Sequence, residues 1–528
     1  MKRLLAYSVI CFLFIGCAQV VAPTGGLKDT TPPEILDIQP ENSSTNFTSK
    51  TIEIEFDEFV RLNQLNDELI VSPPLKNKLE TSIKGKKLII ELNDTLRENT
   101  TYVFNFGNAI VDVNEGNKLE NFQYVFSTGN SIDSLTLSGS VLDAFSLAPE
   151  KEALVMLYDN ITNDSIPYNK LPTYIGRTND KGQFTITNIA AGDYKLFALI
   201  DGNKNYLFDL PTEKIGFISE SINITTGADS VKIHVFEEAR SKQFIEKQEI
   251  KRNRLTLSFN EPLDSFSFKG IDTNLNSILI TQQLTTTKDS VIFWWKEANG
   301  VKLRMQVKDG REFTDTIKFK IDSIPKKSKL KLESSLSKKH PYFKDISLKF
   351  NRPIKSIDTA QMQLFYSDST AVNYTVKIDS SQEQIVLLSF EAIEDSSYKL
   401  SILPNAFIDI YNKTTDSISS KIKFDKASDY GQLTVKVNTN IPSIARVIQL
   451  TDAKGMLLKE QNLIDFQSTF NNLKPGNYRL KLIVDENNNG KWDPGNYLQD
   501  KQAESVILYD EDISMRSNWD QEIEWILK

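Results

Sequence analysis

The sequence contains few of the side chains that bind transition metals or act as nucleophiles. Among its 528 residues there are only two histidines, His234 and His340, and only two cysteines, Cys11 and Cys17. This scarcity excludes most transition-metal sites, cysteine nucleophiles, disulfide frameworks and iron–sulfur centres. The chain also lacks the Gly-x-Ser-x-Gly, Walker, dinucleotide-binding and His-Glu-x-x-His motifs. We therefore expect a protein that is not an enzyme, and we predict no catalytic residues.

An excess of basic residues is also missing. The chain has 62 Lys and Arg against 70 Asp and Glu, which gives a formal net charge of −8. A protein that binds nucleic acid needs clustered Lys and Arg to face the phosphates, so we expect no nucleic-acid partner. Hydrophobic residues make up 40% of the chain, which is ordinary for a globular protein. The length predicts several folded domains.

The N-terminus has the pattern of an export signal. Two basic residues precede the apolar run Leu4–Ile15, which is too short to span a bilayer. The run ends in Phe14-Ile15-Gly16-Cys17, which resembles a lipobox, where signal peptidase II cuts before a lipid-bearing cysteine. The resemblance implies a signal peptide over 1–16, a lipid on Cys17 and therefore a membrane partner. The alternative is an ordinary secretory signal with a chance cysteine.

The residues after Cys17 bear on where such a lipoprotein would reside. Residues 17–30 include Pro, Thr and Gly and few apolar side chains, which predicts a flexible tether. No Asp follows Cys17, so the common inner-membrane retention signal is missing, and no acidic cluster for surface export follows either. We expect an outer-membrane lipoprotein, with the periplasmic face and the cell surface both left open.

The body of the chain has the alternating pattern of β-strands. Apolar and polar residues alternate in Thr51–Phe56, Leu255–Phe259 and Leu433–Val437, and turn-forming residues separate such runs about every ten residues. No convincing amphipathic helix longer than three turns is present. The pattern predicts an all-β protein, a tandem array of about five β-sandwich domains, Ig-like and transthyretin-like, after the signal peptide.

Three segments share a strand that ends in Phe, followed by Asp or Asn, a variable residue, an aromatic or Pro, and an aliphatic residue. They are Phe56–Val60, Phe259–Leu263 and Phe350–Ile354. The first and third segments also lead to a second shared pattern, Asn108–Asp112 and Asn405–Asp409. These motifs resemble the SbsA-type bacterial Ig-like domain. The resemblance implies such domains over 31–129 and 327–425, and a degenerate Ig-like domain over 245–325.

A second repeat is an internal duplication. Residues 188–196 align without a gap with residues 472–480, at an offset of 284, and the alignment continues to Asp209 and Asp493. The repeated residues resemble the carboxypeptidase-regulatory-like, or Cna B-type, sandwich. The resemblance implies such domains over 132–236, called the first copy below, and over 428–528, called the second copy. The whole chain resembles a family of Bacteroidetes Ig-like lipoproteins, in which the stretch Pro23–Asp29 recurs.

The best candidate site is an Asn-rich loop in the second copy. Its oxygen-bearing residues have the spacing of the first nine positions of a calcium loop, with Gly490 at the bend: Asp485, Asn487, Asn489, Lys491 through its carbonyl, and Asp493. The Glu expected at position 12 is replaced by Asn496. The loop predicts a Ca²⁺ site, and the alternative is a turn held by hydrogen bonds from Asn and Asp side chains.

The first copy has a weaker version of this loop. The corresponding residues are Asp201, Asn203, Asn205 and Asp209. Tyr206 stands where the second copy has Gly490, so we expect a less favourable bend and weaker Ca²⁺ binding.

Two classes of function fit these features. The first is a lipid-anchored cell-envelope scaffold or adhesion-type protein, whose β-sandwich array docks other envelope proteins, such as an outer-membrane assembly or transport complex. The second is an envelope carbohydrate-binding or carbohydrate-active protein. The adjacent Trp294 and Trp295 are the main indication for the second class, because one side chain of two neighbours in a strand is expected to face outward and could stack on a sugar.

Overall fold

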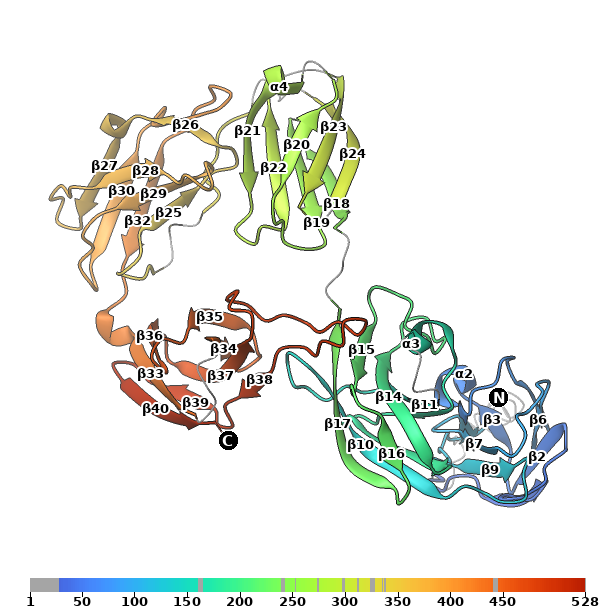
Figure 1. Ribbon diagram of the computed structural model, residues 1–528. Helices are drawn as coiled ribbons and strands as arrows, with labels where there is room; N and C mark the ends of the chain where they lie inside the picture. The colour runs from blue at the N-terminus through green and yellow to red at the C-terminus, as the bar shows by residue number, and fades with distance from the viewer. Residues whose placement is uncertain are drawn as a thin grey trace, which may run out of the picture. The chain divides into compact units, whose positions relative to one another are not determined.

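A computed structural model describes residues 28–527, with gaps at 160–164, 239–242, 252, 273–274, 297–299, 311–312, 323–327, 335, 337–338 and 440–444. Strands dominate the described chain, as Figure 1 shows, and the predicted all-β sandwich array is confirmed. The helices among these residues are single turns: α2 (Leu65–Glu68), α3 (Ile166–Asn169), α4 (Leu275–Ile278), η2 (Thr359–Gln361) and η3 (Ala427–Asp429).

The described chain divides into two compact units. The first consists of the residues up to Glu237 together with the separate segment Asn496–Gln502. The second consists of the residues from Glu238 to Gly495 and from Ala503 onward. A hydrophobic core cluster lies within each of the five ranges expected for a sandwich domain.

The first unit begins with an Ig-like sandwich. Its strands are β1 (Ile35–Gln39), β2 (Thr51–Phe56), β3 (Val60–Leu62), β4 (Ile70–Ser72), β5 (Glu80–Lys84), β6 (Lys87–Glu91), β7 (Thr101–Asn105), β8 (Ile110–Asp112) and β9 (Gln123–Ser127). They form the sheets β1-β2-β6-β5, β4-β7-β9 and β3-β8. Alternate residues of β2 are buried, as the period of two predicts, because one face of its sheet covers the core.

The first copy of the duplicated module completes the first unit. Its strands are β10 (Leu135–Asp143), β11 (Leu154–Tyr158), β12 (Tyr174–Arg177), β13 (Gln183–Ile189), β14 (Gly192–Ile200), β15 (Lys214–Phe217), β16 (Ile222–Ile224) and β17 (Ala228–Glu237). They are ordered β12-β11-β14-β15-β17-β10-β13, with β16 beside β14. Every residue of β11 is buried, so this part of the sheet is covered on both faces.

The second unit begins with two further sandwiches. The strands over 245–325 are β18 (Ile245–Lys251), β19 (Arg254–Phe259), β20 (Ser267–Gly270), β21 (Leu279–Leu284), β22 (Ser290–Trp295), β23 (Val301–Asp309) and β24 (Phe313–Ile321). They form the sheets β18-β19-β22-β21 and β20-β23-β24.

The strands over 327–425 repeat most of the first Ig-like topology. They are β25 (Ile346–Lys349), β26 (Ile354–Ile357), β27 (Met362–Tyr366), β28 (Thr375–Ile378), β29 (Ile385–Ser389), β30 (Ser397–Ile402), β31 (Phe407–Asp409) and β32 (Ile418–Lys423). The sheets β25-β29-β28, β27-β30-β32 and β26-β31 correspond to β2-β6-β5, β4-β7-β9 and β3-β8. The shared sequence motifs therefore accompany a shared strand order.

The second copy of the duplicated module ends the chain. Its strands are β33 (Gly431–Asn438), β34 (Ala445–Asp452), β35 (Leu457–Asn462), β36 (Gln467–Leu473), β37 (Gly476–Asp485), β38 (Val506–Leu508), β39 (Ile513–Met515) and β40 (Asp520–Ile526). The sheets are β36-β33-β40 and β35-β34-β37-β38, with β39 beside β37. In both copies the first strand pairs in parallel with the last, β10 with β17 and β33 with β40, so the duplication extends to the topology.

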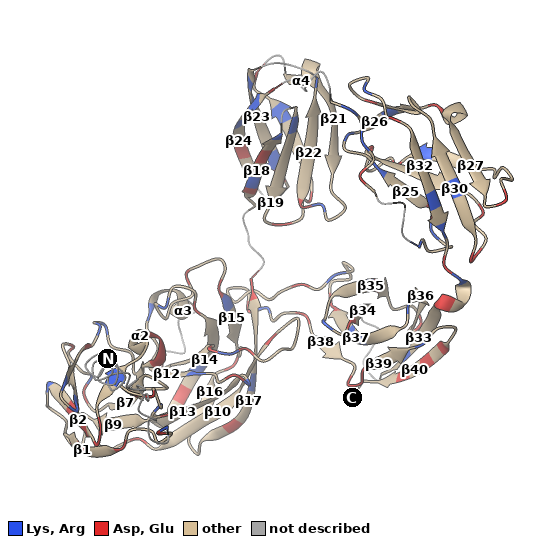
Figure 2. Ribbon diagram, turned by 180° about the vertical axis from the view of Figure 1, so that it is seen from behind, with Lys and Arg blue, Asp and Glu red and all other residues tan. Residues whose placement is uncertain are grey.

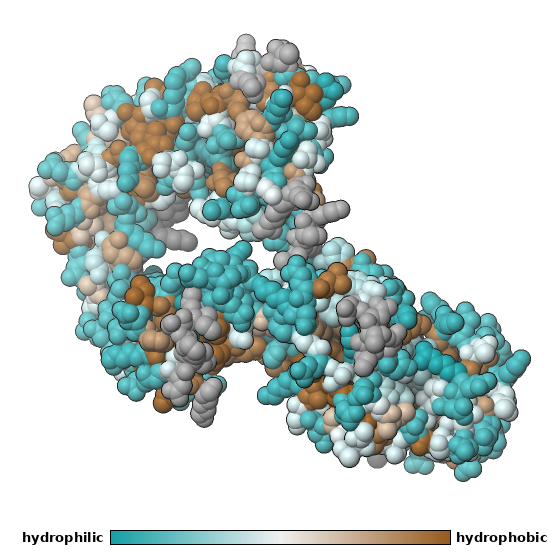
Figure 3. Space-filling view, in the orientation of Figure 1, coloured by the Kyte–Doolittle hydropathy of each residue, from teal (hydrophilic) through white to brown (hydrophobic). Residues whose placement is uncertain are grey.

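Charged and apolar residues are both spread over the surface. Figure 2 shows basic and acidic residues in each of the sandwiches. On the face shown in Figure 3, apolar residues form small groups between hydrophilic ones.

Candidate functional site

The predicted lipidation site, Cys17, lies outside the described residues, as do the signal peptide and most of the tether. Within residues 28–527, where they are described, no helix has the length and apolar character needed to cross a membrane. The lipid anchor therefore stays a prediction from the sequence.

The Asn-rich loop of the second copy is organised around a buried aspartate. Asp485 is the last residue of β37, and only 1% of its surface is exposed. Its Oδ1 accepts a hydrogen bond from the Asn489 N–H at 3.0 Å, and its Oδ2 accepts one from the Gly490 N–H at 2.7 Å. Gly490 has a φ of 79°, which explains why glycine suits this bend.

The amides of the loop converge on its second aspartate. The Nδ2 atoms of Asn487 and Asn489 both donate to Asp493 Oδ2, the latter at 2.6 Å. The Lys491 N–H donates to Asn489 Oδ1 at 3.0 Å. The predicted ligand residues are therefore brought together, in the arrangement of a turn closed by its own side chains.

A third carboxylate, which the sequence motif did not predict, joins this loop. Glu504 is 2% exposed, and its two oxygens accept hydrogen bonds from the N–H groups of Glu486 and Asp493, both at 2.9 Å. Burial raises the pKa of Glu504 above its ordinary value, and the carboxylates of Asp493 and Asp485 raise it further. These three carboxylates make the loop a concentrated negative site.

The first copy repeats the main contacts of this arrangement. Asp201 Oδ2 accepts from the Tyr206 N–H at 2.8 Å, and the amides of Asn203 and Asn205 donate to Asp209 at 2.9 and 2.7 Å. Glu213 takes the place of Glu504, since it accepts from the Asp209 N–H at 3.0 Å. The replacement of glycine by Tyr206 predicted a less favourable bend. Tyr206 nevertheless adopts a φ of 64°, so the tyrosine does not prevent the bend.

A corrected alignment would have revealed the third carboxylate. Asp209 and Asp493 are 284 residues apart, whereas Glu213 and Glu504 are 291 residues apart. The difference is a seven-residue insertion in the second copy, Asn496–Gln502, called the insert below. The spacing rule of the calcium loop expects the acid at position 12, so it overlooked both glutamates.

In both loops each carboxylate accepts hydrogen bonds from N–H donors in this structure. Among the described residues, no group of three or more His, Cys, Asp or Glu side chains is arranged to hold a metal ion. Turning the amides of Asn487 and Asn489 over would aim oxygen, in place of nitrogen, toward the space beside Asp493. Calcium binding at either loop therefore remains a prediction, and the closed turn is the arrangement observed.

The two adjacent tryptophans do not form an exposed platform. Trp294 and Trp295 are 3% and 0% exposed, so the expectation that one of them faces outward is wrong. Trp295 lies in the core, with its ring 5.8 Å from that of Phe293. Trp294 is covered by the guanidinium of Arg254, and the Trp295 carbonyl accepts a hydrogen bond from the Tyr411 hydroxyl at 2.9 Å. The pair is structural.

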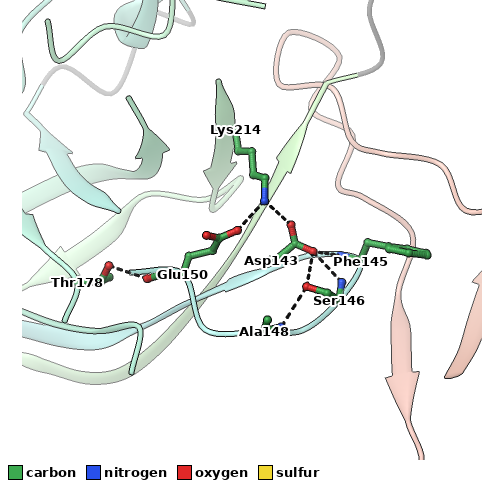
Figure 4. Close-up of polar contacts among 7 residues, drawn as sticks. All are labelled: Asp143, Phe145, Ser146, Ala148, Glu150, Thr178 and Lys214. Atoms are coloured by element: carbon green, nitrogen blue, oxygen red, sulfur yellow. Dashed lines mark hydrogen bonds and ion pairs between the residues drawn. The ribbon is translucent and has the colours of Figure 1, made fainter. Parts of the chain in front are cut away.

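A cluster of charges in the first copy is also structural. Figure 4 shows Lys214, on β15, between the carboxylates of Asp143 and Glu150, at 2.7 and 2.6 Å. Asp143 Oδ1 accepts a further hydrogen bond from the Ser146 N–H at 2.7 Å. Burial would raise the pKa of Asp143, but Lys214 and Ser146 outweigh it and hold this pKa below its ordinary value. The cluster ties β15 to the end of β10.

Comparisons with known proteins support the Ig-like assignment. The family model described as a bacterial Ig-like domain matches residues 29–128. No curated protein is significantly similar to the chain in sequence.

Three solved structures illustrate the remaining similarities. The major pilin subunit BcpA of Bacillus cereus is 10% identical, covering 75% of this chain and 99% of its own, with a TM-score of 0.15. Domains 1–6 of the surface-layer protein SbsC are 11% identical, covering 92% and 67%, with a TM-score of 0.15. A glucan-utilization protein of Bacteroides ovatus, SGBP-B with a heptasaccharide, is 9% identical, covering 65% and 85%, with a TM-score of 0.18. With TM-scores this low, these structures carry no argument about function.

Proposed function

We propose that the protein is a lipid-anchored scaffold of the outer membrane, whose β-sandwiches dock other envelope proteins of an assembly or transport complex and catalyse no reaction. The observation that carries the proposal is the direct packing of neighbouring sandwiches within the first unit. A scaffold must hold its docking surfaces at fixed spacing, and contacts between domains provide this.

Those contacts join the Ig-like sandwich to the first copy. The Ile175 N–H donates to Ser72 Oγ at 3.0 Å, and this site is buried. The Arg177 guanidinium donates to the carbonyl of Asp67, and the Lys204 ammonium pairs with the Asp67 carboxylate. Lys204 belongs to the Asn-rich loop, so in the first copy this loop serves as a joint between two domains.

The membrane part of the proposal depends on Cys17. Cleavage before this residue and attachment of lipid would anchor the chain through the tether 17–30. Replacing Cys17 with Ala should abolish incorporation of labelled palmitate and release the protein from the membrane fraction. Unchanged labelling together with unchanged membrane retention would contradict the anchor.

A second candidate function, carbohydrate binding, has one observation in its favour. A cavity of about 650 Å³ in the first unit is lined mostly by polar side chains, among them Asn105, Gln123, Arg177 and Gln183. Such groups can bond the hydroxyls of a sugar. Titration of the protein with envelope glycans, repeated with Gln183→Ala, tests this function. Binding that the substitution removes would favour it over the scaffold.

The scaffold itself is tested by separating docking from chemistry. A tagged full-length protein is isolated from detergent-solubilised envelope together with its partners, and acidic residues are then replaced one at a time by their amides. We expect every variant that folds and retains its partners to support normal growth. A single substitution that removes function, while folding and co-purification stay intact, would indicate a catalytic carboxylate and overturn the proposal.

A further inference from the structure

The first copy has an aromatic face on the outer side of its sheet. Leu196 and Ala198 of β14 belong to the core cluster, so Phe197 between them points to the opposite side. Phe197 is nevertheless only 1% exposed, and Phe217 of β15 is 4% exposed. Tyr168 of α3 lies near the same face. Apolar side chains on an outer face stay this dry only when another segment covers them.

The segment that completes this cover is the insert, which belongs to the first unit although it lies between β37 and β38 in the chain. The ring of Tyr497 lies 5.2 Å from that of Phe197 and 5.1 Å from that of Phe217, with interplanar angles of 83° and 71°. The Tyr168 ring is 6.2 Å away. These edge-on arrangements are the favourable geometry for aromatic pairs.

The insert is folded so that it presents this ring. Two backbone hydrogen bonds between Asn496 and Lys501, at 2.7 and 2.9 Å, close it into a turn. Tyr497 is 8% exposed, whereas the next residue, Leu498, is 65% exposed. The Gln502 side chain adds a hydrogen bond to the Phe217 carbonyl at 3.1 Å. One side of the turn is therefore a contact surface and the other side is solvent.

The two copies divide the parts of this contact between them. At the position of Phe197 the second copy has Lys481, and at the position of Phe217 it has Leu508. The first copy, which has the aromatic residues, has no counterpart of the insert. The aromatic face thus occurs in one copy and the inserted turn in the other. This is the pattern expected of two surfaces that are specific for each other.

We infer that the insert is an intramolecular clasp, with Tyr497 as its anchor and the aromatic face of the first copy as its receptor. The occupant of that face is this chain's own segment, and a second molecule does not supply it. The clasp goes beyond the proposed scaffold function, because it would hold whether or not the protein docks partners.

Photocrosslinking on the full-length protein tests the clasp. p-Azidophenylalanine, which is close to tyrosine in size, replaces Tyr497 in one sample and the exposed Leu498 in a matched control. After irradiation, mass spectrometry identifies the attached peptides. We expect position 497 to attach to peptides that contain Tyr168, Phe197 or Phe217, at a yield at least about tenfold above that of position 498.

Mixing isotopically light and heavy chains before irradiation separates the two sources of the insert. The clasp predicts products within light chains and within heavy chains only. Products that join a light to a heavy chain would overturn the intramolecular assignment. Equal yields from positions 497 and 498, or attachment of position 497 to other regions, would show that Tyr497 is not the anchor. Tyr497→Phe keeps the aromatic ring, so it should leave the hydrogen-exchange protection of the Phe217 amide unchanged. Loss of that protection in this variant would also contradict an aromatic anchor.

Discussion

The two copies of the duplicated module share their loops and differ on the outer faces of their sheets. Asp201 Oδ2 and Asp485 Oδ2 accept from equivalent N–H groups, and Glu213 and Glu504 accept from the equivalent N–H groups of Asp209 and Asp493. The outer face is aromatic around Phe197 in the first copy and carries Lys481 in the second. The polar loop is present in both copies and is therefore part of the shared module. The outer face of the sheet differs between the copies, so it can be a docking surface in one copy and not in the other.

The strongest way to break this comparison is to truncate the aromatic face. Phe197→Ala should destabilise the first unit by about 3–5 kcal/mol, because it removes a buried ring and leaves a cavity. Lys481→Ala, at the equivalent position of the second copy, should change stability by no more than about 0.5 kcal/mol. Chemical denaturation of the two full-length variants measures both values. Equal losses would show that the two faces are equivalent.

A glycine in the first copy offers the next largest effect. A Cβ at Gly139 would lie 2.1 Å from the carbonyl oxygen of Val231 in the parallel neighbour β17, where the register shifts. Gly139→Ala should therefore cost about 3 kcal/mol, since the backbone of β17 must move. At Gly476 an added Cβ would have no neighbour closer than 3.8 Å, so Gly476→Ala is the control. Denaturation curves that show no difference between the two variants would contradict the close approach.

Calcium would sharpen the comparison of the loops. At a Ca²⁺ concentration 100 times the dissociation constant, binding to the folded state alone would add about 2.7 kcal/mol. We expect millimolar Ca²⁺ to raise the melting temperature of the protein, and Asp485→Ala to remove most of that rise. Asp201→Ala should remove less, because Lys204 of that loop is already paired with Asp67. Identical melting curves with Ca²⁺ and with a chelator would leave both loops as closed turns.

The smallest effect concerns the charge cluster of the first copy. Because the folded state lowers the pKa of Asp143, its carboxylate adds to the free energy of unfolding. This contribution should be complete above the ordinary pKa of 3.8 and should be lost as the pH falls through the lower pKa of the folded state. Lys214→Met should therefore cost about 1 kcal/mol at pH 7 and progressively less in acid. Lys436→Met removes an exposed ion pair with Glu522 in the second copy and should cost less than about 0.5 kcal/mol. Chemical denaturation of the unmodified protein and of Lys214→Met at several pH values measures this loss. A loss of unfolding free energy that grew in acid would contradict the role of the cluster.

Local sequence patterns predicted the features that depend on neighbouring residues. The alternation in Thr51–Phe56 identified β2 and its buried face, and the oxygen spacing from Asp485 to Asp493 identified residues that do converge. Both follow from short-range geometry, the period of a strand and the closure of a loop.

The sequence could not predict features that depend on what covers a surface. Alternation requires a face that meets solvent, so it gave no warning that Trp294 would be buried beneath Arg254. Glu504 escaped notice because the calcium-loop spacing expects its acid at position 12, where neither Glu504 nor Glu213 of the first copy stands. The partner of Tyr497 lies in another part of the chain, and no local pattern connects them.

Hydrogen exchange at β15 tests most directly whether the outer face of the first copy is a docking surface filled by the insert. The amides of Lys214–Phe217 are compared in three full-length proteins: the unmodified chain, Tyr497→Ala and Leu498→Ala. We predict that Tyr497→Ala accelerates exchange in this strand by about tenfold or more, while Leu498→Ala leaves it unchanged. Equal exchange in all three proteins would contradict the account.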